Sequence, residues 1–373
     1  MKNLITLLIL SLSINALSQP IQPHGGEYNG QWKNGVVHGK GTYIWQDGSR
    51  YEGQWKMGQI DGFGTYTWTN GDKYTGFWKH GIISGQGTYV WISGNKYIGS
   101  WENGKRHGFG TITYNANDLY KGDTYSGQWS QDSRNGEGTY QWANGDKYTG
   151  SWLNDLKNGY GTFYYQSQKE FKGDKYIGQW KEDQRVNQGT YIWANGNTYE
   201  GQWENNLING KGTFQSVNGD KYEGQWKNGK KDGEGTFYYL ANNHFKGDSY
   251  KGQWVNDHIE GEGTYYFKAN NQLKGSIYIG SWKNGKMNGT GTFTWSNGNI
   301  YKGSWVNGQR NGNGNLFLRN DGPLNGGQFT GTWKDDEIVG EGTFIWADGS
   351  RYFGQWKDGT MSGHGIFTAN SSK

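Results

Sequence analysis

Basic side chains recur at two fixed places along this 373-residue chain, in a pattern that suits contact with an anionic surface. The chain repeats the string Tyr-x-Gly-x-Trp. A lysine follows the tryptophan eight times, and a lysine or arginine precedes the opening aromatic residue seven times. Each base near an anionic membrane contributes about 1 kcal/mol to binding. The first row is Lys33, Lys56, Lys79, Lys181, Lys227, Lys283, Lys334 and Lys357, and the second is Arg50, Lys73, Lys96, Lys147, Lys175, Lys221 and Arg351.

The same two rows also fit an ordinary solvated surface. The chain has 37 basic and 33 acidic residues, for a net charge of +4, which does not indicate nucleic acid as a partner. Four members of the second row directly follow an acidic residue. The solvated surface is the simpler interpretation, and contact with a membrane surface is the alternative. The acidic neighbours are Asp72, Asp146, Asp174 and Asp220.

Aromatic side chains form a third recurring set. All 21 tryptophans occupy one of two places in the repeat. Rows of such rings could stack on sugars or hold choline-like cations. However, hydrophobic residues make up only 32% of the chain, so the rings are also the main material for a core. Binding of a glycan, a cell-wall polymer or a choline-like ligand through an aromatic face is therefore the alternative function.

The chain offers no recognisable set of catalytic residues. No Gly-x-x-x-x-Gly-Lys-Ser/Thr string occurs, and the recurring glycine pairs fall between strands rather than before a helix. The seven histidines fall at unrelated places in the repeat, and the absence of cysteine excludes thiolate metal sites. We therefore expect a protein that is not an enzyme and has no cofactor or metal.

The elements that carry these rows are fourteen tandem repeats, spaced by 23 or 28 residues. Counted from the opening aromatic residue, position 3 is glycine, position 5 tryptophan and position 14 glycine in every repeat. Position 12 is glycine except at Asn187. Residues that recur at every second position indicate β-strands. The repeats open at Tyr28, Tyr51, Tyr74, Tyr97, Tyr125, Tyr148, Tyr176, Tyr199, Tyr222, Tyr250, Tyr278, Tyr301, Phe329 and Tyr352.

Positions 7 and 8, usually Asn-Gly or Asn-Asp, predict a two-residue hairpin turn. Such a turn is expected to pair position 5 with 10, 3 with 12 and 1 with 14, with all aromatic side chains on one face. The glycines then leave a trough that the rings cover. Representative structural aromatic residues are Tyr28, Trp32, Tyr51, Trp55, Tyr74, Trp78, Tyr222 and Trp226, and the matching glycines are Gly30, Gly39, Gly41, Gly53, Gly62, Gly64, Gly224, Gly233 and Gly235.

A second connection, of three or five residues with a left-handed glycine, is expected between repeats. Five long repeats carry five extra residues here, and in these repeats position 18 is never tryptophan. A ring beside a base suits a membrane interface. We favour the other interpretation, that the ring folds back over the sheet where tryptophan is missing. The loop tips are Tyr120 with Lys121, Phe171 with Lys172, and Phe245 with Lys246.

Residues 1–18 have the features of a signal peptide: Lys2, an apolar run from Leu4 to Leu17, and small residues around the expected cleavage after Ser18. The apolar run is shorter than the roughly 20 residues that span a bilayer. We therefore expect a leader at 19–27, a repeat array at 28–373, and a secreted or periplasmic protein that can lie against a membrane.

The string YEGQWKNGKKDGEGTF at 222–237 closely resembles the MORN repeat (membrane occupation and recognition nexus), and the resemblance extends from residue 28 to about 370. It implies hairpins in an elongated, twisted single sheet, and a role in membrane association or protein scaffolding. Some relatives are lipid kinases, but no residues remain here for a kinase domain. The matching residues are Tyr222, Gly224, Trp226, Asn228, Gly229, Gly233, Gly235 and Phe237.

The sequence thus predicts an all-β fold, an elongated, twisted, single-layer antiparallel sheet of tandem β-hairpins. The expected function is that of a non-enzymatic scaffold or adhesive surface, which binds protein partners or membrane lipid headgroups. Because the edges of such a sheet are open, the chain can also associate end to end.

Overall fold

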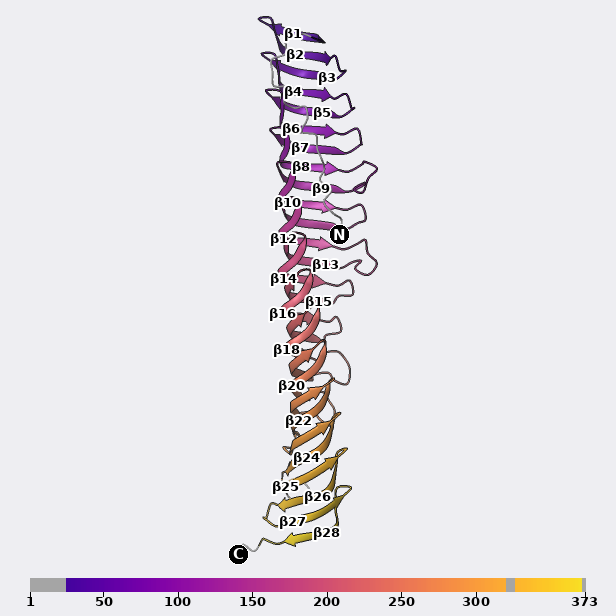
Figure 1. Cartoon of the computed structure of the whole chain (residues 1–373), viewed down its shortest axis with the longest axis vertical. Coiled ribbons are helices and arrows are strands. Elements are labelled where there is room, and N and C mark those ends of the chain that lie inside the picture. The colour runs from indigo at the N-terminus through magenta and orange to yellow at the C-terminus, as the bar shows by residue number, and fades with distance from the viewer. Residues whose placement is uncertain (1–24, 320–325, 371–373) are drawn as a thin grey trace. The chain divides into compact units, whose positions relative to one another are not determined.

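A computed structural model of the chain describes residues 25–319 and 326–370, which form 28 β-strands and no helix. The chain divides into two compact units after Gln184. Within each unit the strands follow one another in chain order (Figure 1). The predicted signal peptide and most of the leader lie outside the described residues, and the last residues of the leader already belong to the first strand.

The first unit contains the strands β1 (Gly26–Lys33), β2 (Val36–Trp45), β3 (Arg50–Lys56), β4 (Gln59–Thr67), β5 (Lys73–Lys79), β6 (Ile82–Val90), β7 (Lys96–Glu102), β8 (Lys105–Thr113), β9 (Thr124–Ser130), β10 (Ser133–Gln141), β11 (Lys147–Leu153), β12 (Leu156–Tyr164) and β13 (Lys175–Lys181). Each consecutive pair of these strands is antiparallel.

The second unit contains β14 (Gln184–Ile192), which begins at the boundary residue, and β15 (Thr198–Glu204), β16 (Leu207–Gln215), β17 (Lys221–Lys227), β18 (Lys230–Tyr238), β19 (Ser249–Val255), β20 (His258–Tyr266), β21 (Ile277–Lys283), β22 (Lys286–Thr294), β23 (Ile300–Val306), β24 (Gln309–Leu318), β25 (Gly327–Lys334), β26 (Glu337–Trp346), β27 (Arg351–Lys357) and β28 (Thr360–Thr368). It repeats the same antiparallel pattern.

The hairpin turn lies where the sequence predicts it. Between β3 and β4, Lys56 pairs with Gln59, so Met57 and Gly58 form a two-residue turn. Both turn residues have left-handed backbone angles, with φ of 50° at Met57 and 81° at Gly58, as a type I′ turn requires. Asparagine or glycine fits such angles best, which explains the composition of positions 7 and 8.

The register beyond the turn differs from the prediction. Trp55 pairs with Ile60 as expected, but Gly53 pairs with Gly64 and Tyr51 with Tyr66, so the predicted pairs 3 with 12 and 1 with 14 are wrong. Position 12 instead forms a bulge, and two extra residues enter the second strand there. Because two residues preserve the alternation of side chains, the predicted division into an aromatic and a polar face is unaffected.

The bulge explains why position 12 requires glycine. Gly62 has a φ of 105°, and Asn187, the one substitute, has a φ of 54°. The side chain of Gln54 lies against Gly62, and its Oε1 accepts the backbone N–H of Phe63 at 2.9 Å. The glutamine at position 4 thus supplies a hydrogen-bond partner that the interrupted ladder lacks.

Consecutive repeats join in a second register. Between β2 and β3, Gly41 pairs with Gly53 and Tyr43 with Tyr51. The connecting loop closes with a 2.9 Å hydrogen bond from the Trp45 N–H to the Ser49 carbonyl, and Gly48 takes the predicted left-handed angle. The glycine at position 3 is therefore paired with a glycine at position 14 on each of its two neighbouring strands.

The opening tyrosine fills the space that these glycines leave. Tyr51 is fully buried, and a Cβ built on Gly64 would lie 2.6 Å from Cε2 of its ring. The Tyr51 hydroxyl donates to the Gln54 carbonyl at 3.1 Å. The tyrosines that open the internal repeats and the tryptophans at position 5 in strands β3–β27 are buried, and they form the core of each unit.

Candidate interaction surfaces

The aromatic face is occupied by contacts among its own rings. Tyr51 lies edge-to-face against Trp55 of its own repeat at 5.2 Å and against Trp78 of the next repeat at 5.8 Å. The Trp55 indole N–H donates to the Gly41 carbonyl of the preceding repeat at 3.1 Å. Burial raises the pKa of the Tyr51 phenol, as expected for a group that is held neutral in a core.

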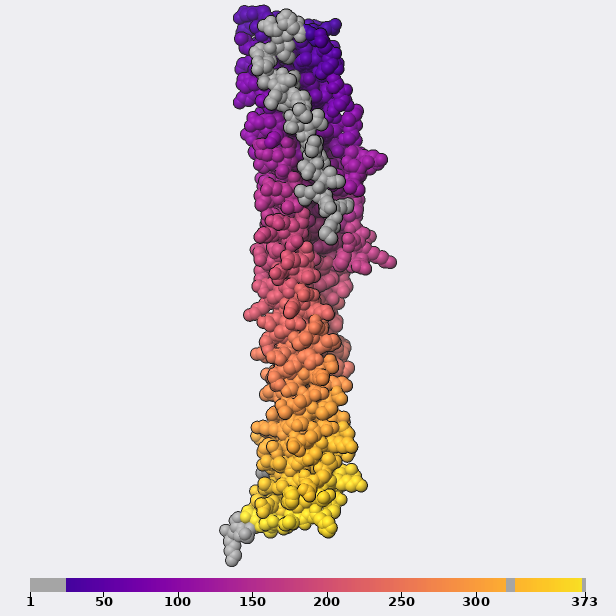
Figure 2. Space-filling view, viewed as in Figure 1, coloured from indigo at the N-terminus to yellow at the C-terminus, as the bar shows by residue number. Residues whose placement is uncertain are grey.

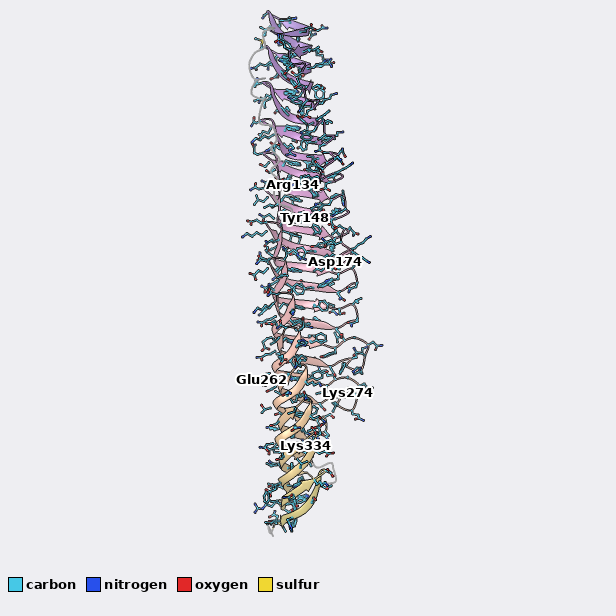
Figure 3. All side chains as sticks on the ribbon, turned by 45° about the vertical axis from the view of Figure 1, so that its right-hand side comes forward. Arg134, Tyr148, Asp174, Glu262, Lys274 and Lys334 are labelled. Atoms are coloured by element: carbon cyan, nitrogen blue, oxygen red, sulfur yellow. The ribbon has the colours of Figure 1, made fainter. Side chains whose placement is uncertain are left out.

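Six basic side chains at position 10 lie on this aromatic face, and the sequence argument did not identify them. The Arg106 guanidinium carbon lies 4.2 Å from the centroid of the Trp129 ring, and its Nε donates to Asp132 at 3.1 Å. Arg134, which is labelled in Figure 3, makes the same contacts with Trp152 and Asp155. Each cation therefore covers the tryptophan of the next repeat and pairs with the turn residue at position 8.

Positions 10 and 8 of neighbouring repeats are matched along the chain. An apolar residue at position 10 is always followed by glycine at position 8 of the next repeat, and a base is always followed by aspartate or asparagine. The apolar pairs are Val37–Gly58, Ile60–Gly81, Ile83–Gly104, Ile208–Gly229, Ile259–Gly285, Met287–Gly308 and Ile338–Gly359. The basic pairs are Arg106–Asp132, Arg134–Asp155, Lys157–Asp183, Arg185–Asn206, Lys231–Asp257 and Arg310–Asp336.

This matching has a direct physical cause. A base that lies over a tryptophan is removed from water and needs a charged or polar partner. Asp155 supplies one, and it also accepts the backbone N–H of Arg134 at 2.9 Å. Where position 10 is apolar no such partner is needed, and glycine meets the left-handed angle of the turn at least cost. We call this relation the 10–8 match.

The predicted basic rows lie on the opposite face. We define the polar face by eight positions of each repeat, with position 0 taken as the residue before the opening aromatic residue. Positions 0, 2, 4 and 6 lie on the first strand, and positions 9, 13, 15 and 17 lie on the second. Strand β5 shows the alternation, with Lys73 and Lys79 exposed while Tyr74 and Trp78 are buried. Position 0 and position 6 stand at opposite ends of each first strand, so the two rows flank the face.

The acidic neighbours of these bases do not face them. Asp72 is buried, and its carboxylate accepts the backbone N–H of Ile92 at 2.8 Å and the hydroxyl of Tyr89 at 3.0 Å, both from the next repeat. Asp174 is also buried, and Asp146 accepts backbone N–H groups of the following loop. The carboxylates of Asp72 and Asp146 connect successive loops through hydrogen bonds to backbone N–H groups, rather than forming ion pairs with the adjacent lysines.

The polar face of the first unit is strongly basic. Within β1–β13 its only acidic residues are Glu27, Glu52, Glu102 and Glu137, and Arg50 forms a 2.7 Å ion pair with Glu52. The bases outnumber them by eleven to four. They are Lys33, Lys40, Arg50, Lys56, Lys73, Lys79, Lys96, Lys105, Lys147, Lys175 and Lys181.

The second unit has a more balanced polar face. It also carries eleven bases, namely Lys211, Lys221, Lys227, Lys230, Lys251, Lys283, Lys286, Lys302, Lys334, Arg351 and Lys357, but seven acids accompany them. The acids are Glu200, Glu204, Glu223, Glu234, Glu262, Glu337 and Glu341. A shallow groove over β14–β19 contains members of both groups, including Glu200 and Lys211.

The polar face of the first unit carries four exposed aromatic rings, whereas that of the second unit carries one, Phe353. Phe63 and Phe77 are directly paired across β4 and β5, and their rings meet edge-to-face at 5.4 Å. Phe109 and Tyr160 occupy the same row at position 13, and each is 62% exposed. These four rings lie along the middle of the face, between the two basic rows.

The rings at the loop tips contact the aromatic residue at position 18 of their own repeat and also stay partly exposed, by 37% at Tyr120, 40% at Phe171 and 42% at Phe245. Tyr120 lies 5.6 Å from Tyr114 and Phe245 lies 5.6 Å from Tyr239, so each covers the residue that stands in place of tryptophan. Phe171 contacts Tyr165 at 6.2 Å. Two of these loops project from the first unit in Figure 2, and Lys274 marks another in Figure 3.

Residues 25–319 and 326–370 contain no group of three or more His, Cys, Asp or Glu side chains that could hold a metal ion. Nor does this part of the chain contain a helix long and apolar enough to cross a membrane.

Comparison with known proteins identifies the repeat. Fourteen segments match the MORN repeat family, and they cover most of the chain. None of the curated proteins compared with the chain matches it. The matched residues are 28–50, 51–73, 74–96, 97–118, 125–147, 148–169, 176–198, 199–221, 222–239, 250–272, 278–300, 301–320, 329–351 and 352–372.

Solved structures that match the chain weakly include two domains of the TCP type. The TCP domain of Drosophila melanogaster SAS-4, in complex with a proline-rich motif of Ana2, is 14% identical; the match covers 45% of this chain and 87% of that chain, with a TM-score of 0.27. The TCP10 domain of Danio rerio CPAP, in complex with a STIL peptide, is 10% identical over 73% of this chain and 90% of that chain, with a TM-score of 0.21. Likenesses this weak carry no argument about function.

Proposed function

Since the chain belongs to the MORN repeat family, we propose that it is a non-enzymatic scaffold whose first unit attaches to an anionic membrane surface through the polar face. This proposal rests on the occurrence of excess positive charge together with exposed aromatic rings on that face. Eleven bases stand against four acids, and four exposed rings run between the two basic rows.

This combination suits a lipid headgroup layer for a physical reason. The bases lie at both ends of the first strands, where they can approach phosphate groups, and each contributes about 1 kcal/mol near an anionic surface. Aromatic rings such as Phe63 and Tyr160 are favoured at the boundary between headgroups and acyl chains. The extracytoplasmic location predicted from residues 1–18 would present this face to the outer side of a membrane.

Binding of a glycan or choline-like ligand through the aromatic face has less support. The opening tyrosines of internal repeats are fully buried, and guanidinium groups such as that of Arg106 already occupy the faces of several tryptophans. The indoles at position 18, such as Trp45, are only partly buried and remain the accessible part of this face. A protein partner for the polar face is the other outcome that the following experiment can reveal.

The test is flotation of the full chain, purified after any removal of residues 1–18, with anionic or zwitterionic vesicles at low and physiological salt. We expect selective flotation with anionic vesicles that weakens as salt rises. Charge reversal at Lys33, Lys56 and Lys79 removes three bases at about 1 kcal/mol each, so binding falls by roughly 150-fold or more.

A matched control reverses three lysines at the same position of the second unit: Lys283, Lys334 and Lys357. The change in net charge is identical, so the proposal predicts a much smaller loss of flotation for this variant. Equal losses would show that the first unit has no special part in binding and would contradict the proposal. If the unmodified chain does not float under any condition, the membrane proposal fails, and an acidic protein surface becomes the partner to seek.

A further inference from the structure

The two end strands expose side chains that the other strands bury. Trp32 in β1 is 49% exposed, whereas the tryptophan at the same position in β3, Trp55, is 2% exposed. In β28, Phe367 is 62% and Met361 is 48% exposed, although positions 16 and 10 contribute buried residues elsewhere. Each end thus shows one half of the contact that joins consecutive repeats.

These two halves are complementary. We propose that copies of the chain associate head to tail, with β28 of one copy antiparallel to β1 of the next, in the register that joins consecutive repeats. By analogy with the β2–β3 pairing, Gly363 lies opposite Trp32, Gly365 opposite Gly30, and Phe367 opposite Tyr28 of the neighbouring copy. The junction would then continue both the glycine ladder and the aromatic face from copy to copy.

The 10–8 match supports this partner. Met361 stands at position 10 of the last repeat and Gly35 at position 8 of the first, so the junction combines an apolar residue with glycine. The pair Met287 and Gly308 makes the same combination within the chain, where the Gly308 N–H donates to the Met287 carbonyl at 2.9 Å. A base at position 361 would have lacked a carboxylate in the next copy.

The polar side of the junction is also compatible. His364 would face Gln31, Ile366 would face Asn29, and Thr368 would face Glu27, so no like charges oppose one another. At the Met287–Gly308 junction, Trp305 donates its indole N–H to the Gly291 carbonyl and packs on Tyr278 at 5.4 Å. Trp32 would gain the corresponding carbonyl of Gly365 and the ring of Tyr352.

Such a contact differs in kind from a two-fold dimer. It joins two different surfaces, so every added copy leaves one head and one tail free, and growth stays open-ended. A two-fold dimer through β28 alone would bury two tails and stop. Head-to-tail association and a two-fold dimer can therefore be distinguished by variants that are altered in only one of the two end strands.

The experiment exploits the lack of cysteine in the chain. Asn29→Cys and Ile366→Cys place one thiol on each edge, at positions that would be directly opposite in the proposed junction. Oxidation of the full-length double variant should give a ladder of covalent multiples. A mixture of the two single variants should give a covalent heterodimer and nothing larger.

The intramolecular pair Thr42→Cys with Glu52→Cys is the matched control, because these residues are paired at an internal junction in the same way. It should oxidise within one chain and show that these positions can cross-link. Cross-linked dimers of Ile366→Cys alone, without heterodimers in the mixture, would indicate tail-to-tail association and overturn the proposal. A double variant that stays monomeric while the control oxidises would overturn it as well. No lipid is present, so the result is independent of the membrane proposal.

Discussion

Replacement of Gly64 by alanine tests the central feature of the fold, the ring that lies over paired glycines. Gly64 does not require a left-handed angle, so alanine there carries no backbone penalty of that kind. However, its Cβ would lie 2.6 Å from Cε2 of Tyr51 and closer still to the hydroxyl. The ring cannot move away freely, because Trp55 and Trp78 both lie edge-on against it.

The expected cost follows from these contacts. Overpacking of a tight core costs about 1–3 kcal/mol. Displacement of the ring also loses the hydrogen bond from the Tyr51 hydroxyl to the Gln54 carbonyl, worth about 1 kcal/mol. We therefore expect Gly64→Ala to destabilise the β3–β4 hairpin by roughly 2–4 kcal/mol.

Gly58→Ala is the control, since Gly58 has a φ of 81° and lies in the turn of the same hairpin, away from the Tyr51 ring. Its cost should be only the backbone term, about 1 kcal/mol. Hydrogen exchange of peptides from β3 and β4 measures the local opening free energy, which suits an array whose contacts are between neighbours.

A double variant separates the steric term from any other effect. Tyr51→Ala removes the ring, so Gly64→Ala should cost less than about 1 kcal/mol in that background. The reasoning would be refuted if the two changes were additive, or if Gly64→Ala cost no more than Gly58→Ala.

Two further predictions concern the junctions and the buried phenols. Ile60→Arg should destabilise its junction by about 1–3 kcal/mol, and Gly81→Asp in the same chain should restore most of the loss, because the pair recreates the 10–8 match; equal exchange rates in the single and double variants would contradict the match. Burial raises the pKa of several opening tyrosines, such as Tyr51 and Tyr74, and that of Tyr301 to about 12, so their contribution to stability is complete below the unfolded value near pH 10 and is lost as the pH rises through the folded value. Absorbance near 295 nm should therefore show these phenols ionising together with unfolding, and ionisation at pH 10 with an intact fold would count against the buried-phenol interpretation.

The sequence is sufficient to predict the hairpin turn, the two faces and the loop between repeats, because each depends on local rules. The left-handed backbone angles at positions 7 and 8 and the alternation of side chains along a strand can both be predicted without knowing the partner strand. The prediction of the strand register was wrong at Gly62, because a bulge and a regular pair both place this glycine on the same face of the sheet. The sequence did contain a signal for the bulge. Glutamine occupies position 4 in many repeats, and the amide of Gln54 supplies the hydrogen bond that only a bulge requires.

The positions of the charged residues were harder to predict. Asp72 is adjacent to Lys73 in the sequence, but in the structure its carboxylate accepts a hydrogen bond from the Tyr89 hydroxyl of the next repeat. Arg134 was overlooked because a base on an aromatic face contradicts simple patterning. The 10–8 match could have revealed it, since the correlation between positions 10 and 8 is readable from the sequence alone.

The residues that define the repeat cannot determine what the protein binds. Tyr51, Gly53, Trp55 and Gly64 are each occupied in forming the sheet, and the same holds for their counterparts in other internal repeats. Specificity must therefore reside in positions that the repeat leaves free, which are those of the polar face and the two end strands. In the first unit these positions carry eleven bases against four acids and a row of four exposed rings. In the second unit they carry eleven bases against seven acids and one exposed ring, that of Phe353. A chain with the same repeat but acids at position 6 would keep this fold and lose the surface that we propose for membrane attachment.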